Sequence, residues 1–243
     1  MKVTVTATNS AGSTQQDSAP TDPVSDTVAP PPPRMLAPSG ERTLALRMKV
    51  AWDSNAAGVE TFDVRSRTTS PSESFGDYTT ILNDTAETQT MVDVTDGSTY
   101  CFSSRAVDEA GNRSEWSSER CSAVPLDDRS FEASGFERRS GTAFFAGTMS
   151  RAARRGAVLS VAEVRAKELY LVASKCPGCG RVAVSFNGRR LTTIDLGART
   201  SSHRRLIRVA GFASIRSGTL QIRVLSDRLP VKIDGLVLGV PLS

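Results

Sequence analysis

Residues 97–121 read GSTYCFSSRAVDEAGNRSEWSSERC and predict two antiparallel strands that reverse at Gly111. If Cys101 faces Cys121, the midpoint of the pairing falls on Gly111, and glycine adopts the positive φ of a tight turn without a Cβ clash. Facing residues on paired strands lie within reach of a disulfide. The segment therefore predicts a hairpin closed by a Cys101–Cys121 bond, which we expect to stabilise the fold by roughly 3 kcal/mol.

The rest of the 243-residue chain carries the same kind of pattern. Short runs that alternate apolar and polar residues are separated by Gly, Pro, Asn, Asp and Ser, which is typical of all-β sandwiches. The length suffices for two ordinary domains, each with a core of its own. No apolar run approaches the roughly 18 residues of a membrane-spanning segment, so we expect no membrane insertion.

Charge is divided unevenly along the chain. Residues 1–125 hold 10 Lys+Arg and 17 Asp+Glu, a net charge of −7, whereas residues 126–243 hold 20 and 9, a net charge of +11. The basic half favours an anionic partner, and ordinary solubility is the alternative interpretation. The four cysteines, at positions 101, 121, 176 and 179, fit two local disulfides and therefore an extracellular or cell-surface location.

Residues 1–24 repeat the hairpin pattern with an offset of 99. Gly12 falls on Gly111 at this offset, and Met1 falls on Tyr100, inside a strand. A strand cannot begin a domain without the partners that bury its apolar face. We therefore interpret the segment as a truncated β-hairpin of a preceding repeat, and the chain as the C-terminal part of a longer protein whose signal peptide lies upstream.

A proline-rich spacer and a first complete domain follow. Residues 25–38 contain five of the 12 prolines, four of them consecutive, which favours an extended, semi-rigid linker. Residues 39–125 then form the first complete domain. Its early run LALRMKVAW places a set of apolar side chains on one strand face, which we expect to be buried: Leu44, Leu46, Met48, Val50 and Trp52.

Several motifs of this domain resemble the fibronectin type III fold. They are Trp52 at the end of an early strand, the Phe62-Asp63-Val64 strand, Gly97-Ser98-Thr99-Tyr100, and the run from Ala106 to Gly111. The resemblance covers about 90 residues, about 34–125, and implies an immunoglobulin-like sandwich, in which Tyr100 closes a corner by bonding to upstream backbone. The cysteine pair departs from the usual pattern of that family.

A second resemblance concerns Trp116. Ser114-Glu115-Trp116-Ser117 resembles half of the Trp-Ser box of cytokine-receptor domains, in which arginines stack on tryptophans. In a simple hairpin register Arg105 and Trp116 lie on opposite faces, so stacking would need a bulge. We therefore expect Trp116 to be an ordinary core or edge residue.

Residues 126–243 predict a second, basic β-sandwich. Asn187-Gly188 fits a two-residue hairpin turn, and eight short strands suggest a closed sandwich or jelly roll. The segments VSFNGRRLTTIDL, SGTLQIRVL and VKIDGLVL resemble the last strands of galactose-binding-like jelly rolls, the carbohydrate-binding modules appended to secreted bacterial enzymes. The predicted strands are Ala143–Met149, Gly156–Val161, Glu168–Ala173, Arg181–Phe186, Arg189–Leu196, Arg204–Val209, Thr219–Leu225 and Val231–Leu238.

The segment Cys176-Pro177-Gly178-Cys179-Gly180 fits a type II turn whose ends lie close enough for a structural disulfide. A zinc knuckle has the same form, but zinc needs four ligands and the chain has a single histidine, His203. A reactive dithiol is a third interpretation, although no βαβ pattern surrounds the motif. We favour the disulfide of Cys176 with Cys179, and we expect neither a metal nor a cofactor.

No catalytic arrangement emerges from the residues. The only histidine, His203, stands beside two arginines, which does not favour a Ser-His-Asp triad. Asp195 and Asp234 are strand residues without an evident partner for acid and base chemistry. The sequence also lacks a phosphate-binding glycine loop and an HExxH motif. We therefore predict that this chain by itself is not an enzyme.

Arginines of the second domain are the candidate binding residues, because their planar forks suit carboxylate and phosphate groups. The candidates for an anion or glycan site are Arg151, Arg154, Arg155, Arg204, Arg205 and Tyr170, and the same basic set includes Arg189, Arg190 and Arg208. The domain has no tryptophan on which a sugar could stack; its aromatic residues are Tyr170 and Phe131, Phe136, Phe144, Phe145, Phe186 and Phe212.

Together these features predict a non-catalytic adhesion or carbohydrate-binding accessory module of a secreted or surface-exposed bacterial protein. A purely structural spacer is one alternative. The accessory tail of a polysaccharide-degrading glycoside hydrolase, with its catalytic domain upstream, is another. The expected partner is a polysaccharide or an anionic cell-wall polymer and not nucleic acid, and we expect a monomeric segment of a larger chain.

Overall fold

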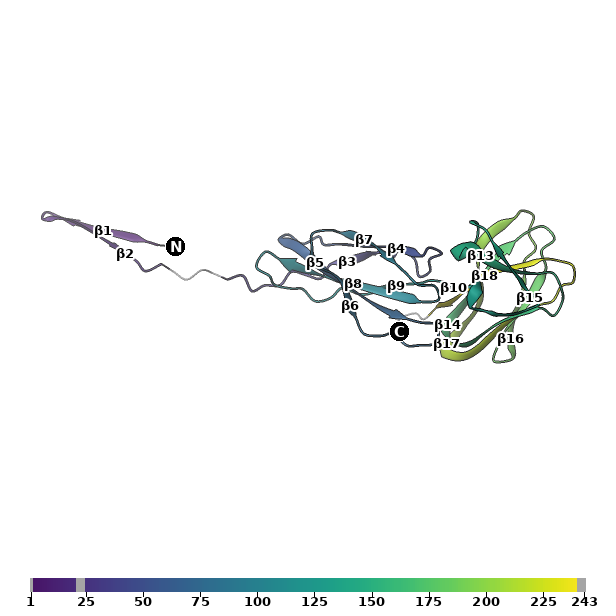
Figure 1. The fold of residues 1–243 in the computed structure, drawn as a ribbon. Helices are drawn as coiled ribbons and strands as arrows, with labels where there is room; N and C mark the ends of the chain where they lie inside the picture. Colours follow the sequence, from purple (N-terminus) through teal and green to yellow (C-terminus); the bar gives the residue numbers. More distant parts are fainter. Residues whose placement is uncertain (1, 21–24, 240–243) are drawn as a thin grey trace.

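The computed structural model describes residues 2–20 and 25–239. Its elements are eighteen β-strands and two short 3-10 helices, η1 (Asp128–Ser130) and η2 (Phe145–Gly147), so the predicted all-β class is confirmed. Figure 1 shows a small N-terminal hairpin, a first sandwich in blue and teal, and a second β unit in green and yellow at the opposite end. Within the described residues, no helix is long and apolar enough to cross a membrane.

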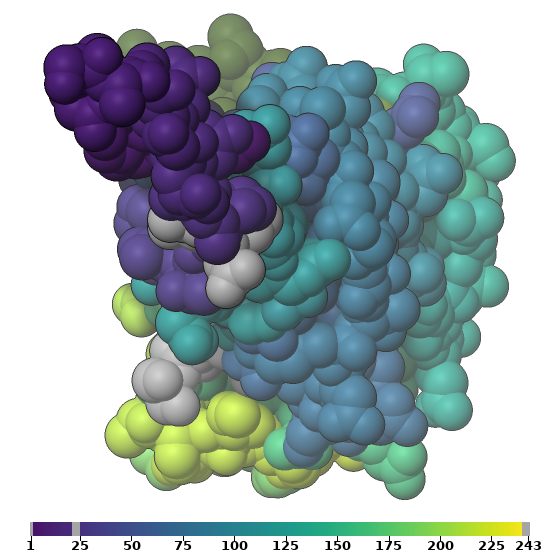
Figure 2. Space-filling model, turned by 90° about the vertical axis from the view of Figure 1, so that its left-hand side faces the viewer, coloured from purple at the N-terminus to yellow at the C-terminus, as the bar shows by residue number. Residues whose placement is uncertain are grey.

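The N-terminal hairpin consists of β1 (Thr4–Asn9) and β2 (Gly12–Asp17), in which Asn9 pairs with Gly12. The side-chain oxygen of Asn9 accepts a hydrogen bond from the amide of Ala11 and so shapes the turn. Every described residue of this hairpin is exposed, because a two-stranded ribbon has no second layer to bury a face. In Figure 2 it is the purple lobe that stands out from the blue sandwich.

The first sandwich packs a three-stranded sheet against a four-stranded one. The first sheet has the order β3 (Arg34–Ala37), β4 (Arg47–Asp53), β7 (Gln89–Asp93), and the second has the order β6 (Thr79–Thr85), β5 (Val59–Thr69), β8 (Thr99–Asp108), β9 (Arg120–Ala123). Strand β3 lies inside the segment predicted as a linker. It belongs to the sandwich because Met35 pairs with Trp52 and both are buried.

The prediction that one face of the run LALRMKVAW is buried is correct only for the residues that belong to β4. Met48, Val50 and Trp52 are buried there and pack with residues of the facing sheet such as Phe102. Leu46, by contrast, precedes the strand and is 41% exposed, so its predicted burial is wrong.

The Gly97–Cys121 hairpin is regular only at its open end. Cys101 pairs with Cys121, and the two form the predicted disulfide. Gly111 adopts a φ of 84° at the reversal. On the return, Ser114 and Ser117 bridge to β8 through their amides and also through their hydroxyls, which accept hydrogen bonds from β8 amides. The returning chain therefore becomes a strand only at β9.

The irregular return places Trp116 against two arginines. The guanidinium carbons of Arg65 and Arg105 lie 4.0 and 4.7 Å from the centre of its ring. Arg65 also lies 3.7 Å from the ring centre of Tyr78, which extends the stack. The prediction that Trp116 is an ordinary core or edge residue is wrong, because outside a regular strand register its ring can lie against cations of the neighbouring strands.

The second unit is one nine-stranded sheet that folds back on itself. Its strand order is β12–β13–β18–β14–β17–β15–β16, with β10 beside β18 and β11 beside β14. The strands are β10 (Leu126–Asp127), β11 (Glu132–Ser134), β12 (Glu137–Ser140), β13 (Thr148–Ala152), β14 (Val158–Lys175), β15 (Arg181–Phe186), β16 (Arg189–Asp195), β17 (Ser202–Val224) and β18 (Val231–Gly239).

Strands β14 and β17 are long enough to take part in two layers. The first half of β14 pairs with β11, its second half pairs with β18, and β17 follows it along most of its length. The sequence pattern predicts two strands where β14 lies and two where β17 lies. That prediction is wrong, because the chain bends at bulges without leaving the sheet. The predicted strand Ala143–Met149 is also wrong over most of its length, since η2 occupies it.

The second unit packs against one end of the first sandwich. Ala123, Val172 and Val237 form an apolar cluster at this contact. Beside them the Arg42 guanidinium donates to the Glu168 carboxylate at 2.5 Å. The two units are therefore joined by side-chain packing as well as by the chain between them.

Candidate functional site

Two of the arginines predicted to bind a ligand make hydrogen bonds to the backbone instead. Arg204 donates to the backbone carbonyls of residues 142–144 at distances between 2.6 and 3.1 Å and anchors that loop. Arg155 donates to the Leu225 carbonyl at 2.9 Å. Both guanidinium groups thus hold backbone in place.

The other residues of the predicted anion or glycan site do not form one patch either. Arg42 lies 3.9 Å above the ring centre of Tyr170, so this tyrosine belongs to the contact between the units. Arg151 sits on β13 opposite β12, whereas Arg154 and Arg205 are exposed. None of the six predicted residues lines the hollow described next.

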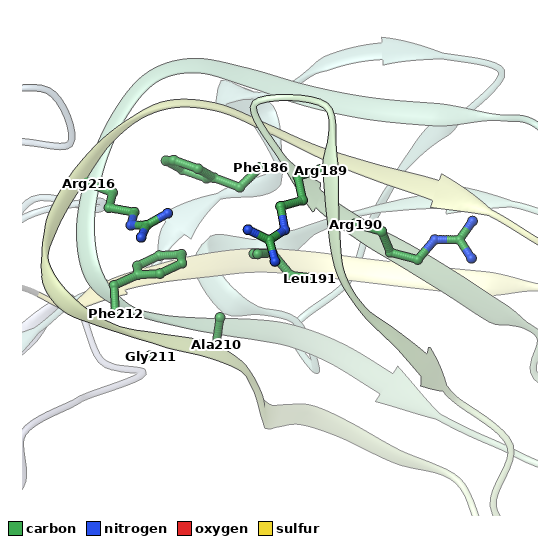
Figure 3. Close-up of a pocket in the computed structure, with 8 residues that line it drawn as sticks. All are labelled: Phe186, Arg189, Arg190, Leu191, Ala210, Gly211, Phe212 and Arg216. Carbon is green, nitrogen blue, oxygen red and sulfur yellow. The ribbon is translucent and has the colours of Figure 1, made fainter.

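A hollow of about 290 Å³ opens at the bend of β17, opposite the hairpin of β15 and β16 (Figure 3). This volume is near the lower end of the range for small-molecule sites. Phenylalanines, arginines and small apolar residues line it. They are Phe186, Arg189, Arg190, Leu191, Ala210, Gly211, Phe212 and Arg216.

One wall is shaped by the turn between β15 and β16. Asn187 and Gly188 have φ values of 49° and 75°, the two positive values of a type I′ turn, so Phe186 pairs directly with Arg189. Leu191 is an extra residue on β16 and makes a bulge just after the turn. The turn carries Arg189 to the rim, where its guanidinium points into the hollow in Figure 3.

The opposite wall is an arch in β17. Gly211 pairs with Glu168 and Arg216 pairs with Ala166, so residues 212–215 bulge out against a single residue of β14. The arch lifts this part of β17 away from its partner strand. It therefore creates the space that the hollow occupies.

Aromatic rings and guanidinium groups meet inside this space. The guanidinium carbon of Arg216 lies 5.1 Å from the ring centre of Phe212, and the rings of Phe212 and Phe186 are 5.7 Å apart. Arg189 points toward the same space, whereas Arg190 points away (Figure 3). No acidic side chain lines the hollow. Its electrostatic field is therefore positive over an aromatic floor.

Asn187 ties the two walls together. Its side-chain oxygen accepts a hydrogen bond from the Thr219 amide at 2.8 Å, and its side-chain NH2 group donates to the Ser217 carbonyl at 3.3 Å. Gly218 lies between these two partners, and a Cβ atom there would lie 2.0 Å from Asn187 Oδ1. Only glycine permits this close approach, so the hollow is preformed by a specific contact between its walls.

We expect Asn187→Ala to lower the free energy of unfolding by about 1 kcal/mol, because two backbone groups lose their partner. Urea unfolding followed by circular dichroism measures the change. Asn83→Ala is the matched control, since Asn83 is exposed and, among the described residues, its side chain bonds to the neighbouring Asp84 alone. Equal losses in the two variants would contradict a locking role for Asn187.

A group of buried carboxylates lies where β10 meets β18. Asp128 accepts hydrogen bonds from the Thr148 and Ser150 hydroxyls at 2.6 and 2.7 Å, and burial raises the pKa of its carboxyl. Asp234 accepts one hydrogen bond, from the Phe145 amide at 2.8 Å, and its other oxygen has no partner among the described residues. Burial raises the pKa of Asp234 to about 7, so this carboxyl is readily kept protonated.

Both cysteine pairs are oxidised. The predicted disulfide of Cys176 with Cys179 is confirmed, which excludes the zinc-knuckle interpretation for this state of the protein. Among the described residues, one group has the spacing of metal ligands, namely Cys101, Glu119 and Cys121. The first disulfide takes up both of its sulfur atoms.

The single histidine has a serine partner. Ser174 Oγ lies 2.9 Å from His203 Nδ1, and the histidine ring stands edge-on to Phe144 at 5.3 Å. Ser174 is only 1% exposed, so its hydroxyl is out of reach of an external substrate. This contact orients the ring and does not present a nucleophile.

Most residues of the hollow stand out in the sequence, but the sequence did not predict that they lie together. Phe186 and Phe212 appear among its aromatic residues, and Arg189 and Arg190 appear among its arginines, but Arg216 is missed. The two-residue turn predicted after β15 is a local signal for where Arg189 lies. No local signal marks the arch that brings Arg216 to the same place.

No family model matches the sequence, and no curated protein matches it. Among solved structures, a family two carbohydrate esterase from Cellvibrio japonicus is similar at 16% identity and a TM-score of 0.37, over 49% of this chain and 35% of that one. An exo-β-1,3-galactanase from Phanerochaete chrysosporium is similar at 10% identity and a TM-score of 0.39, over 86% and 57%. A structure of carbohydrate-binding modules from the β-sandwich superfamily is similar at 10% identity and a TM-score of 0.36, over 89% and 100%. The chain spans less than two thirds of the first two proteins, and similarity at this level says nothing about its activity.

Proposed function

We propose that this chain is a non-catalytic, carbohydrate-binding accessory module of a secreted or surface-exposed protein, and that the hollow is its binding site. In this proposal residues 39–125 are a fibronectin type III domain and residues 126–243 are a jelly-roll-like binding domain. The two disulfides support an extracellular or cell-surface location, because such bonds persist in oxidising compartments.

The preformed hollow is the observation that carries the proposal. A phenylalanine floor with arginine donors at the rim suits a ligand that has apolar and polar faces, as sugars do. Because the Asn187 contacts already hold the walls together, little conformational entropy of the walls is lost when a ligand binds. The lining offers no pair of acid and base groups, so its residues are suited to binding and not to bond cleavage.

A structural spacer is the second candidate, and the contact between the units favours it. The Arg165 amide donates to the Pro71 carbonyl at 2.7 Å, and the Arg165 side chain donates to the Ser74 hydroxyl at 2.8 Å. Together with the Arg42–Glu168 ion pair, these bonds fix how the second unit sits on the first. A spacer needs this rigidity but makes no use of the hollow.

A glycan array probed with the full chain separates the two candidates. We expect the chain to bind a subset of the glycans, and we expect Phe212→Ala to weaken that binding at least about tenfold, because the ring forms the floor of the hollow. Tyr78→Ala is the control, since it removes an exposed ring of the first sandwich. Circular dichroism of each variant checks the fold. An array without signal would support the spacer.

A further inference from the structure

We infer that the hollow recognises a carboxylate group of its ligand, because Arg189 and Arg216 converge on it from opposite walls, and that the module therefore selects acidic glycans over neutral ones. This inference rests on the proposed function and names the ligand class of the same site. Three features of the hollow carry it: the direction of the two guanidinium groups, their free donors, and the covered aromatic face.

The two guanidinium groups approach each other from different elements. Arg189 comes from the β15–β16 turn and Arg216 follows the arch of β17, and in Figure 3 their side chains point toward each other from opposite sides of the hollow. A guanidinium presents its N–H donors in a planar fork that matches the two oxygens of a carboxylate. A single carboxylate between the two forks can therefore receive donors from both walls.

The donors of these two arginines have no partner among the described residues. Other arginines of the second unit are committed, since Arg204 holds backbone carbonyls and Arg129 is paired with Asp127. Among the hydrogen bonds and ion pairs of the described residues, none involves the guanidinium group of Arg189 or of Arg216. Two uncompensated cations that face one hollow favour an anion there by Coulomb attraction.

The cation that lies on the aromatic floor favours an acidic sugar over a neutral one. Arg216 already lies over the face of Phe212, and Phe186 is only 5% exposed. A neutral sugar that stacked on this face of Phe212 would have to displace the cation from the ring. A carboxylated sugar leaves Arg216 in place and adds a charge-assisted hydrogen bond to it. The arrangement therefore favours binding of a carboxylate.

Calorimetric titration of the full chain with carboxylated polysaccharides tests the inference. The probes are polygalacturonate, alginate and hyaluronate, each compared with its methyl ester, which keeps the sugar backbone and removes the charge. We expect the acid form of at least one of them to bind at least about tenfold more tightly than its ester, and we expect high salt to weaken that binding.

Substitutions assign the binding to the two arginines. We expect Arg189→Ala and Arg216→Ala each to weaken binding of the acid form about tenfold or more, and Arg189→Lys to weaken it less, because lysine keeps the charge but not the fork. Arg154→Ala is the control, since it removes the same charge from an exposed side chain of the second unit that does not line the hollow. It should change the affinity less than about twofold.

Other outcomes overturn the inference in distinguishable ways. Equal binding of acid and ester, or binding of neutral glycans alone, refutes carboxylate recognition and leaves the carbohydrate-binding proposal standing. Binding of dextran sulfate with no binding of the carboxylated polymers refutes the choice of carboxylate over sulfate. No binding of any acidic or neutral glycan refutes both proposals. An equal loss in Arg154→Ala and Arg189→Ala refutes the assignment of the site.

Discussion

The stability advantage of Asp234→Asn over the wild-type protein is expected to grow by about 4 kcal/mol between about pH 3 and about pH 8. Asp234 is 1% exposed on β18, and burial raises the pKa of its carboxyl from 3.8 to about 7. Between these two values the folded protein binds more protons than the unfolded chain does. The stability of the wild-type protein contributed at this site therefore falls as the pH rises through that window.

Asparagine removes this dependence because it cannot ionise. Its amide oxygen can still accept the hydrogen bond from the Phe145 amide, so the local structure keeps its one partner. Denaturant unfolding of both proteins at a series of pH values measures the difference, and contributions from all other carboxyl groups largely cancel. Asp77→Asn removes the same charge from an exposed position and should show little such trend. A difference between Asp234→Asn and wild type that stays constant with pH would contradict the prediction.

Replacing both Cys101 and Cys121 with alanine is expected to lower the free energy of unfolding by about 3 kcal/mol, because this disulfide closes a loop with a sequence separation of 20. The same change at Cys176 and Cys179 should cost only about 1.5 kcal/mol, since their separation is 3 and the unfolded chain loses little freedom. The two pairs therefore serve as controls for each other. They differ mainly in loop length.

Chemical unfolding of the oxidised protein and of the two double variants measures these losses. Thiol titration of the unreduced protein must find the four sulfurs protected for the comparison to apply. Equal losses in the two variants would show that loop length does not govern the stabilisation. A larger loss at Cys176 and Cys179 than at Cys101 and Cys121 would contradict the prediction.

Local features of the sequence were sufficient for the fold class and for its turns. The Cys101–Cys121 pairing was predictable because the chain reverses at Gly111, midway between the two cysteines, and the open end of the hairpin pairs regularly. The Asn187-Gly188 turn was predictable as well, since two residues decide its backbone conformation. The Cys176–Cys179 disulfide was predictable because a four-residue turn brings its own ends together.

Contacts between segments that are far apart in the sequence could not be predicted from these local features. The arch of residues 212–215 depends on how β17 follows β14 through its bulges, and this arch alone brings Arg216 to Arg189. Trp116 met its arginines because serine side chains replaced regular strand pairing on the return of the hairpin.

By itself, then, the sequence determined the all-β class, the tight turns and both disulfides, since each depends on residues close together along the chain. The tertiary structure decided which strands are continuous, which carboxyl is buried and which side chains share the hollow. The physical reason is that alternation has a period of two residues and reports only which side chains share a strand face, whereas packing selects the partner of that face.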